Sequence, residues 1–159
     1  SMNDIFGRVC TFFVAAAIMF GMPLIYMNER AKTAEQLYLL TEATHFVDSV
    51  CNTGLVSGEM LRSLYAALCA ENAVYEISLL HEQPEYVYDE QRDAYVRCET
   101  FYDEETIWEQ VGTGADYLLS RGDFFRITVR RQAGFTLFAM IPDRTVSVQY
   151  GGTIKYEAY

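Results

Sequence analysis

The chain has 159 residues, of which 51% are hydrophobic and 21% charged, and its net charge is −10. That length is enough for one folded domain with a core plus one additional element. A nucleic-acid-binding protein normally displays a basic stripe, and because the sequence shows none, we expect no nucleic-acid partner.

The first predicted element is a helix from Val9 to Met27, a stretch without a charged residue. About 20 helical residues span a hydrocarbon core of roughly 30 Å, so this stretch is long enough to cross a membrane. A buried core helix of this length normally carries charges, and a cleaved signal peptide shows a basic start and a small-residue cleavage site, which "YMNERAK" lacks. We therefore expect a retained single span in the cell membrane, with residues 1–28 as tail and transmembrane helix and residues 29–159 as an extracytoplasmic α+β domain.

Small residues in this stretch let transmembrane helices approach closely, and proline is more frequent in membrane helices than in soluble ones. The positive-inside rule gives almost no indication of orientation, because Arg8 precedes the span while Arg30 and Lys32 follow it. The short N-terminal tail leads us to expect that it stays inside. The residues predicted to face lipid or sister helices are Val9, Phe12, Phe13, Ala16, Met19, Phe20, Gly21, Pro23 and Leu24.

The helical pattern continues beyond the span, because no Pro or Gly lies between Met27 and Asn52. We predict one helix from about Val9 to Cys51, on the order of 65 Å long, that ends at Gly54. A stripe at spacings of three and four predicts the face that packs on the downstream domain. Its members are Ala34, Leu37, Leu40, Thr44, Val47 and Val50.

After Gly54 the sequence predicts a second helix, capped by Ser57 and closed at Asn72, and a short helix capped by Asp103. Alternating apolar residues predict several strands, and the acidic stretch "HEQPEYVYDEQRD", residues 81–93, reads as an exposed loop. The predicted strands are residues 74–80, 94–102, 135–141 and 145–150, a further strand with Phe125, Ile127 and Val129 on one face, and a final short strand in the tail. The fold class is therefore α+β, with a long N-terminal helix and a second helix packed on an antiparallel sheet of about four strands.

The sequence offers no clear metal or redox chemistry. His45 and His81 lack partners at metal-ligand spacing, so we interpret both as ordinary histidines. No C-x-x-C motif is present among Cys10, Cys51, Cys69 and Cys98. Outside the cell a disulfide between Cys51 and Cys69 is the preferred pairing, because they end two successive helices joined by a short turn; buried free thiols are the alternative.

Three short patterns have both a functional and a structural interpretation. "GTGAD" resembles a fragment of a phosphate loop without its preceding strand. The "RGD" triplet at 121–123 is a cell-adhesion tripeptide, but it also makes a natural turn before a strand. The acidic loop lacks the calcium-loop pattern, so a solvated loop is its default interpretation. Its carboxylates are Glu82, Glu85, Asp89, Glu90 and Asp93.

The combination of a charge-free N-terminal segment, a long amphipathic helix and a small α+β domain resembles the type IV pilin-like plan. The middle of the chain is similar to pilin-related proteins of Gram-positive Tad-type (tight adherence) clusters, on the stretches "FVDSVCNTGLVSGEMLRSLYAAL", "VYEISLLHE" and "SRGDFFRITV". In prepilins a Gly precedes an apolar run with Glu at its fifth place. Here Gly7 is followed by Arg8, and Phe12 stands at the fifth place. The resemblance therefore implies an accessory or minor pilin-like subunit.

These observations predict a non-enzymatic, membrane-anchored subunit of a type IV or Tad-like pilus or secretion apparatus that assembles through its apolar helix. Its expected partners are the membrane, other pilin-like subunits or secretion-apparatus proteins, and itself. A single-pass adaptor or sensor is the alternative; its Tyr-rich sheet or acidic loop would bind a protein or ligand. An extracytoplasmic enzyme would need a nucleophile–base pair, which the sequence does not display, so we expect no catalytic residue, metal or cofactor.

Overall fold

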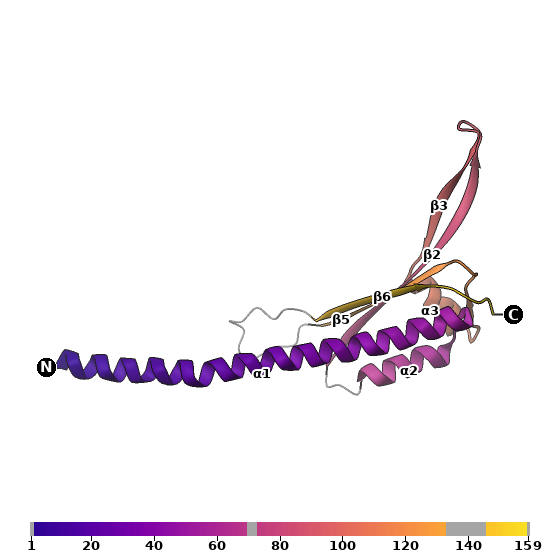
Figure 1. Ribbon diagram of the computed structural model, residues 1–159. Helices are drawn as coiled ribbons and strands as arrows, with labels where there is room; N and C mark the ends of the chain where they lie inside the picture. Colours follow the sequence, from indigo (N-terminus) through magenta and orange to yellow (C-terminus); the bar gives the residue numbers. More distant parts are fainter. Residues whose placement is uncertain (1, 70–72, 133–145, 159) are drawn as a thin grey trace. The chain divides into compact units, whose positions relative to one another are not determined.

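The computed structural model describes residues 2–69, 73–132 and 146–158 of the chain (Figure 1). The predicted helix end at Asn72, the strand at 135–141 and the turn after it lie outside the described residues. The chain forms two units, Ser1–Glu35 and Gln36–Tyr159, and the latter is called the head unit below. Helix α1 (Met2–Thr53) contributes to both units. The sequence predicts this, because the helical pattern continues beyond the apolar segment.

The predicted α+β class is confirmed, because the head unit combines helices with two antiparallel sheets. The larger sheet has the strand order β3-β2-β5-β6, and the smaller one pairs β1 with β4. The remaining elements in chain order are β1 (Leu55–Val56), α2 (Gly58–Cys69), β2 (Tyr75–Asp89), β3 (Ala94–Tyr102), α3 (Glu104–Gly112), β4 (Tyr117–Leu118), β5 (Phe124–Arg131) and β6 (Ser147–Thr153). The tail predicted as a last strand instead prolongs β6 through Thr153.

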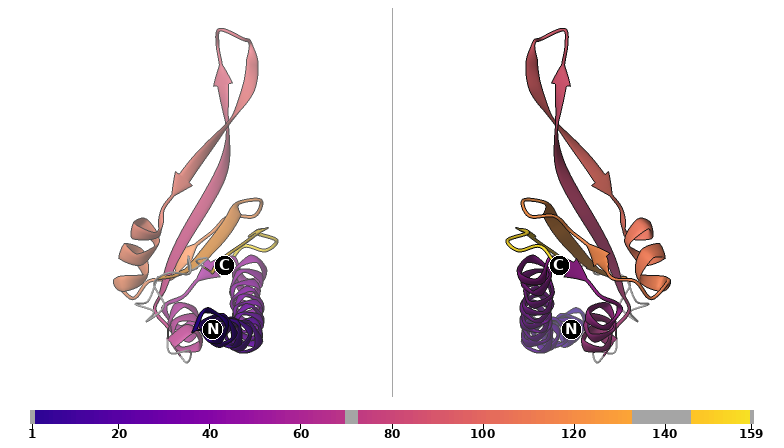
Figure 2. Two further views of the ribbon diagram at one scale, coloured as in Figure 1. Left: turned by 90° about the vertical axis from the view of Figure 1, so that its left-hand side faces the viewer. Right: turned by 90° about the vertical axis from the view of Figure 1, so that its right-hand side faces the viewer.

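Within the head unit, the part of α1 from Gln36 onward and helix α2 lie side by side on one face of the four-stranded sheet (Figures 1 and 2). Alternate residues of β5, Phe125, Ile127 and Val129, are fully buried against them, as their period-2 pattern predicts. The ring of Phe125 lies 6.1 Å from that of Phe46 on α1. Burial of this apolar surface is the main source of the stability of the head unit.

The face of α1 that packs on the sheet differs from the predicted stripe. The buried residues are Leu39, Ala43, Phe46, Val47, Val50 and Cys51. Leu37 and Leu40 are exposed, so only Val47 and Val50 of the predicted stripe enter the core. The stripe was placed too far around the helix because Leu37 and Leu40 are as apolar as the residues that pack, and hydrophobicity alone does not separate adjacent faces.

Helix α1 begins at Met2, earlier than the predicted start at about Val9, whereas the predicted stop at Gly54 and the caps at Ser57 and Asp103 are confirmed. Gly54, at φ +70°, ends α1 in the left-handed conformation that favours glycine. Ser57 caps α2 by accepting the N–H of Met60 at 3.2 Å. Asp103 caps α3 by accepting the N–H of Thr106 at 3.3 Å.

Strand β2 is twice as long as predicted, because the acidic stretch at 81–93 is a β-hairpin arm. Residues Tyr75–Glu82 of β2 pair with β5, whereas Gln83–Asp89 pair only with Ala94–Thr100 of β3. We call these two paired segments and their turn the β2–β3 arm, which extends beyond the rest of the sheet (Figure 2). Pro84 lies in the part of β2 that has a neighbour on one side, where a strand tolerates proline.

The predicted disulfide is not formed, since Cys51 and Cys69 are both free thiols. Helix α2 runs back along α1, so the hydroxyl of Tyr38 donates to the carbonyl of Ala67 at 2.9 Å. The C-terminal end of α2 therefore lies roughly 20 Å along the helix axis from Cys51, at 1.5 Å rise per residue. A short turn between antiparallel helices places their C-termini at opposite ends, which the prediction overlooked. Cys51 is instead buried, and burial raises the pKa of its thiol.

Candidate functional site

The apolar part of α1 is the first candidate for a functional surface. By length and composition this helix is able to cross a membrane, and none of its most apolar stretch is buried within the structure. The large side chains predicted to face lipid, such as Phe12, Met19 and Phe20, are exposed. A soluble protein rarely leaves so many large apolar side chains uncovered on one element, which indicates a surface that something else covers.

This segment has two different faces. At about 100° per residue, the predicted assembly residues other than Gly21 share one broad face of bulky side chains. Gly21 lies on a narrower face whose residues are spaced three or four positions apart in the chain. We call it the small-residue face. Its members are Gly7, Cys10, Val14, Ala17 and Gly21. A Cβ added at Gly7 or Gly21 would meet nothing within 4 Å, so the backbone of this face is open to close approach.

Two polar side chains of α1, those of Thr11 and Arg30, make contacts that are compatible with an apolar surrounding. The Thr11 hydroxyl donates to the carbonyl of Gly7 at 2.8 Å, so its hydrogen bond stays within the helix. At the C-terminal end of the apolar stretch the guanidinium of Arg30 lies 5.1 Å from the centre of the Tyr26 ring. A cation over an aromatic ring at this position is typical of the boundary between lipid and water.

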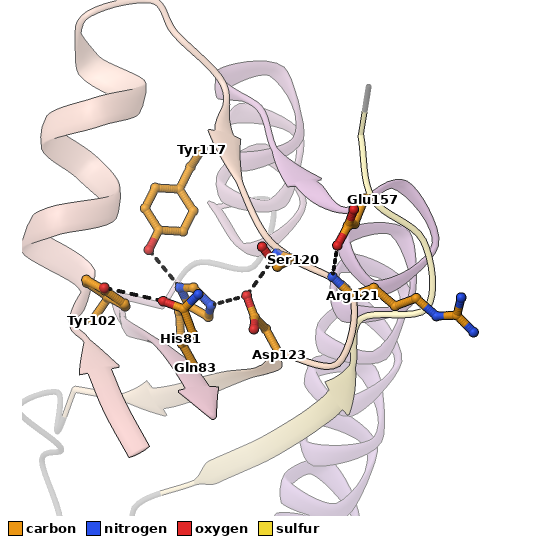
Figure 3. A network of polar contacts seen from close by, with 8 residues as sticks. All are labelled: His81, Gln83, Tyr102, Tyr117, Ser120, Arg121, Asp123 and Glu157. Atoms are coloured by element: carbon orange, nitrogen blue, oxygen red, sulfur yellow. Dashed lines mark hydrogen bonds and ion pairs between the residues drawn. The ribbon is translucent and has the colours of Figure 1, made fainter. Parts of the chain in front are cut away.

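The second candidate is a buried polar network in the head unit (Figure 3). His81, at 4% exposure, lies between Tyr117 and Asp123. Its Nδ1 is 2.8 Å from the Tyr117 hydroxyl, and its Nε2 is 2.9 Å from Oδ2 of Asp123. The ring of Tyr102 stacks on the imidazole at 5.2 Å. The network thereby joins β2, β3, β4 and the turn before β5.

This network has the connectivity of a nucleophile, a base and an orienting carboxylate, but its setting does not favour catalysis. Burial first, and then the charges of Tyr102 and Asp123, raise the pKa of Tyr117 to about 12, which opposes formation of a nucleophilic phenolate. Neither of the two cavities described in the head unit is lined by any of the three residues. The arrangement instead satisfies three buried polar groups with one another.

The RGD triplet belongs to the same network. Asp123 is 3% exposed, and its Oδ2 also accepts the backbone N–H of Ser120 at 2.8 Å. Gly122 adopts φ +96°, and the backbone N–H of Arg121 donates to Glu157 at 2.9 Å. An adhesion motif must present its carboxylate to a receptor, whereas this carboxylate is enclosed. The turn interpretation of the triplet therefore agrees with the structure.

The acidic residues of the stretch 81–93 are dispersed rather than converging on one point. Glu82 forms an ion pair with Arg126 at 2.8 Å, and Asp89 lies 3.7 Å from Arg92. The Tyr88 hydroxyl donates to Asp93, and this bond raises the pKa of Tyr88. Within the described residues, no group of three or more His, Cys, Asp or Glu side chains is placed to hold a metal ion.

The remaining sequence patterns have structural roles. The "GTGAD" stretch follows the C-terminus of α3 and leads to β4, whereas a phosphate loop precedes a helix N-terminus. His45 is exposed and borders an open groove of about 390 Å³ between α1 and α2. The network around His81 was missed because its members lie 36 and 42 positions apart in the chain. The sequence places His81 directly after the predicted strand 74–80, at the start of a predicted exposed loop, and therefore gives no sign that this histidine is buried.

Comparison with known proteins identifies no relative, since no family model, no curated protein and no solved structure matches the chain.

Proposed function

We propose that this chain is a non-enzymatic, membrane-anchored, pilin-like subunit of a type IV or Tad-like pilus or secretion apparatus. In this proposal Val9–Met27 lies in the cell membrane, and the head unit is extracytoplasmic. The observation that carries it is the uncovered apolar stretch of α1, which leads without a break into a helix that forms the core of the head unit. A protein built in this way uses one helix both to stand in lipid and to hold its folded domain.

Assembly through this helix is expected to use the small-residue face. In lipid the hydrophobic effect does not drive helices together, so close packing of backbones at small residues supplies much of the attraction. The bulky face then contacts lipid. Ala16, which we predicted as an assembly residue together with Gly21, lies about 140° from Gly21 around the helix and belongs to the bulky face.

The native Cys10 provides a direct test, because it lies on the small-residue face. In the full chain carrying Cys69→Ser and Cys98→Ser, mild oxidation in reconstituted bilayers is expected to link Cys10 to Cys10 of a second copy or of a pilin-like partner. A matched variant with Cys10→Ser and Phe13→Cys, which places the thiol on the bulky face, is expected to crosslink far less. Equal crosslinking from both faces would indicate random collision and contradict the proposal.

Substitutions on the two faces give a second readout. Gly21→Leu is expected to reduce Cys10 crosslinking several-fold, since a bulky side chain keeps the backbones apart. Ala16→Leu is the matched control and is expected to leave the yield nearly unchanged. If both variants crosslink as well as the native chain, this helix does not assemble through the small-residue face.

The alternative is a single-pass adaptor or sensor that acts through its head unit and never assembles through its helix. The exposed β2–β3 arm favours this candidate, because it is well suited to contact another protein. A monomer in bilayers, with no Cys10 crosslink but with a partner bound at the arm, would distinguish the adaptor from the pilin-like subunit.

A further inference from the structure

The β2–β3 arm has unpaired backbone edges among the described residues. Strand β3 is the outermost strand of its sheet, so its outer edge has no strand neighbour there. Beyond Glu82, the opposite edge of β2 also has none, because the pairing with β5 stops at that residue. Free strand edges are templates for the addition of an extended segment.

One face of the arm is aromatic. The register places Tyr88 opposite Tyr95 and Tyr86 opposite Arg97, so these four side chains share a face. Tyr86 and Tyr95 are 66% and 73% exposed, and the ring of Tyr95 lies 5.3 Å from that of Tyr88 in an edge-on arrangement. Phe101, on the same face nearer the sheet, is 56% exposed. A folded chain gains little internal stability from such residues, whereas exposed tyrosines are effective contact residues.

The aromatic face is surrounded by negative charge. Between Gln83 and Thr100 five acidic residues stand against two arginines. Both arginines already form ion pairs, Arg97 with Glu99 at 3.1 Å and Arg92 with Asp89. Glu85 and Glu90 form no ion pair within the described part of the chain. The local field therefore favours an approaching cation.

We infer that the β2–β3 arm is a docking surface for an extended, Lys- and Arg-rich segment of a partner protein. Cationic side chains of that segment would lie over the rings of Tyr86, Tyr88 and Tyr95, in the negative field of the surplus carboxylates of the arm. Its backbone would add to the free outer edge of β3. This inference goes beyond the assembly of the apolar helix and stands whether or not that assembly occurs.

The negative charge of the arm favours a basic protein segment over two other occupants, a second copy of the chain and an anionic lipid surface. A second copy of the chain carries the same net charge of −10, and its arm would bring acidic residues against acidic residues. An anionic lipid surface would be repelled in the same way. A basic protein segment complements both the charge and the aromatic surface.

The test uses the full chain in nanodiscs of phosphatidylcholine, whose headgroups carry no net charge. Fluorescence anisotropy measures the Kd of an alternating Arg–Thr peptide, which places all its cations on one face when extended. The combined variant Tyr86→Ser, Tyr88→Ser and Tyr95→Ser is expected to weaken binding by roughly tenfold or more. It leaves the net charge unchanged, so general attraction of a polycation to an acidic protein cannot produce this result.

Matched controls separate the arm from the rest of the head unit. Tyr156→Ser removes an exposed tyrosine elsewhere and is expected to leave the Kd within about twofold. Glu85→Gln with Glu90→Gln is expected to weaken binding more than Glu109→Gln with Asp116→Asn, a pair with the same charge change outside the arm. Circular dichroism checks that each variant keeps its fold.

Three results would overturn the inference. The first is the absence of peptide binding at millimolar concentration, and the second is an unchanged Kd in the triple tyrosine variant. The third is self-association of the chain that depends on the three tyrosines, observed by sedimentation, because the occupant would then be a second copy.

Discussion

At the scale of single residues, His81 illustrates how a polar side chain becomes part of a core. Nδ1 of the imidazole contacts the Tyr117 hydroxyl and Nε2 contacts Oδ2 of Asp123, so each group satisfies its neighbour. Tyr117 and Asp123 lie 36 and 42 positions from His81 in the chain, so the sequence does not reveal this arrangement. The sequence predicts His81 at the start of an exposed loop, whereas the tertiary fold buries it on β2 and supplies its partners.

Tyr117 predicts a specific dependence of stability on pH. Its pKa is about 12 in the folded chain against 10.0 as its ordinary value, so the folded state retains a proton that the unfolded state loses above pH 10. The free energy of unfolding is therefore expected to fall between pH 10 and 12, by about 1.4 kcal/mol per pH unit from this group. Tyr117→Phe should lack this part of the decrease.

Urea unfolding of the full chain in detergent, at pH 9 to 11, measures that difference. At neutral pH Tyr117→Phe is expected to cost about 1–3 kcal/mol, because Nδ1 of His81 loses its partner. Above pH 10 the gap between native and variant should narrow. Parallel curves for the two proteins would show that Tyr117 does not titrate as the buried network requires.

Gly54 gives a second prediction at this scale. A Cβ at this position would overlap the carbonyl oxygen of Tyr156, and φ +70° is unfavourable for any other residue. Gly54→Ala is expected to destabilise the head unit by about 2–4 kcal/mol. Gly114, at φ +86° with nothing within 4 Å of an added Cβ, is the matched control, and Gly114→Ala should cost only about 1 kcal/mol. If thermal unfolding shows the same loss of stability for Gly54→Ala and Gly114→Ala, the close approach of the Tyr156 carbonyl to Gly54 would be contradicted.

At the scale of elements, the sequence predicts secondary structure best where a single pattern, such as apolar alternation or a capping residue, is not obscured by another. The period of β5 and the capping residues Ser57 and Asp103 led to the observed elements. The sequence of the arm predicts a loop because it contains Pro84 and many acidic side chains. Neither face of this exposed ribbon is continuously apolar, so the alternation typical of a strand is obscured. The α1 face was misplaced because its solvent side also carries leucines.

The arm is expected to be separable from the fold of the head unit. Replacing residues 85–98 by Asn-Gly would join Pro84 to Glu99, which are register partners, through a turn that suits a two-residue hairpin. The free energy of unfolding should change by no more than about 1 kcal/mol, because the arm lies outside the core. Binding of the Arg–Thr peptide should be lost at the same time. A collapse of the urea midpoint would instead show that the arm supports the sheet.

At the scale of the whole molecule, the sequence separates two chemistries along the chain. Val9–Met27 carries no charge, whereas the acidic residues lie almost entirely after Asn28. The apolar stretch requires a cover that the described structure does not supply, while the acidic head unit is well solvated. The proposed membrane anchor supplies such a cover, because a hydrocarbon core of roughly 30 Å matches both the length of the stretch and the absence of charge in it.

The proposed membrane insertion makes a prediction that can be tested on the full chain. Ala15→Arg with Ile18→Arg places two charges near the middle of the stretch, where each costs about 2.5–3.5 kcal/mol of insertion free energy. This variant is expected to leave the membrane pellet under alkaline carbonate extraction, whereas the native chain stays in it. The matched variant Arg8→Ala with Tyr26→Arg changes residues only at the two ends of the stretch, where charges are tolerated, and should stay in the pellet. Retention of the doubly charged variant, with the near-ultraviolet circular dichroism of the head unit unchanged, would mean that something other than lipid covers this helix.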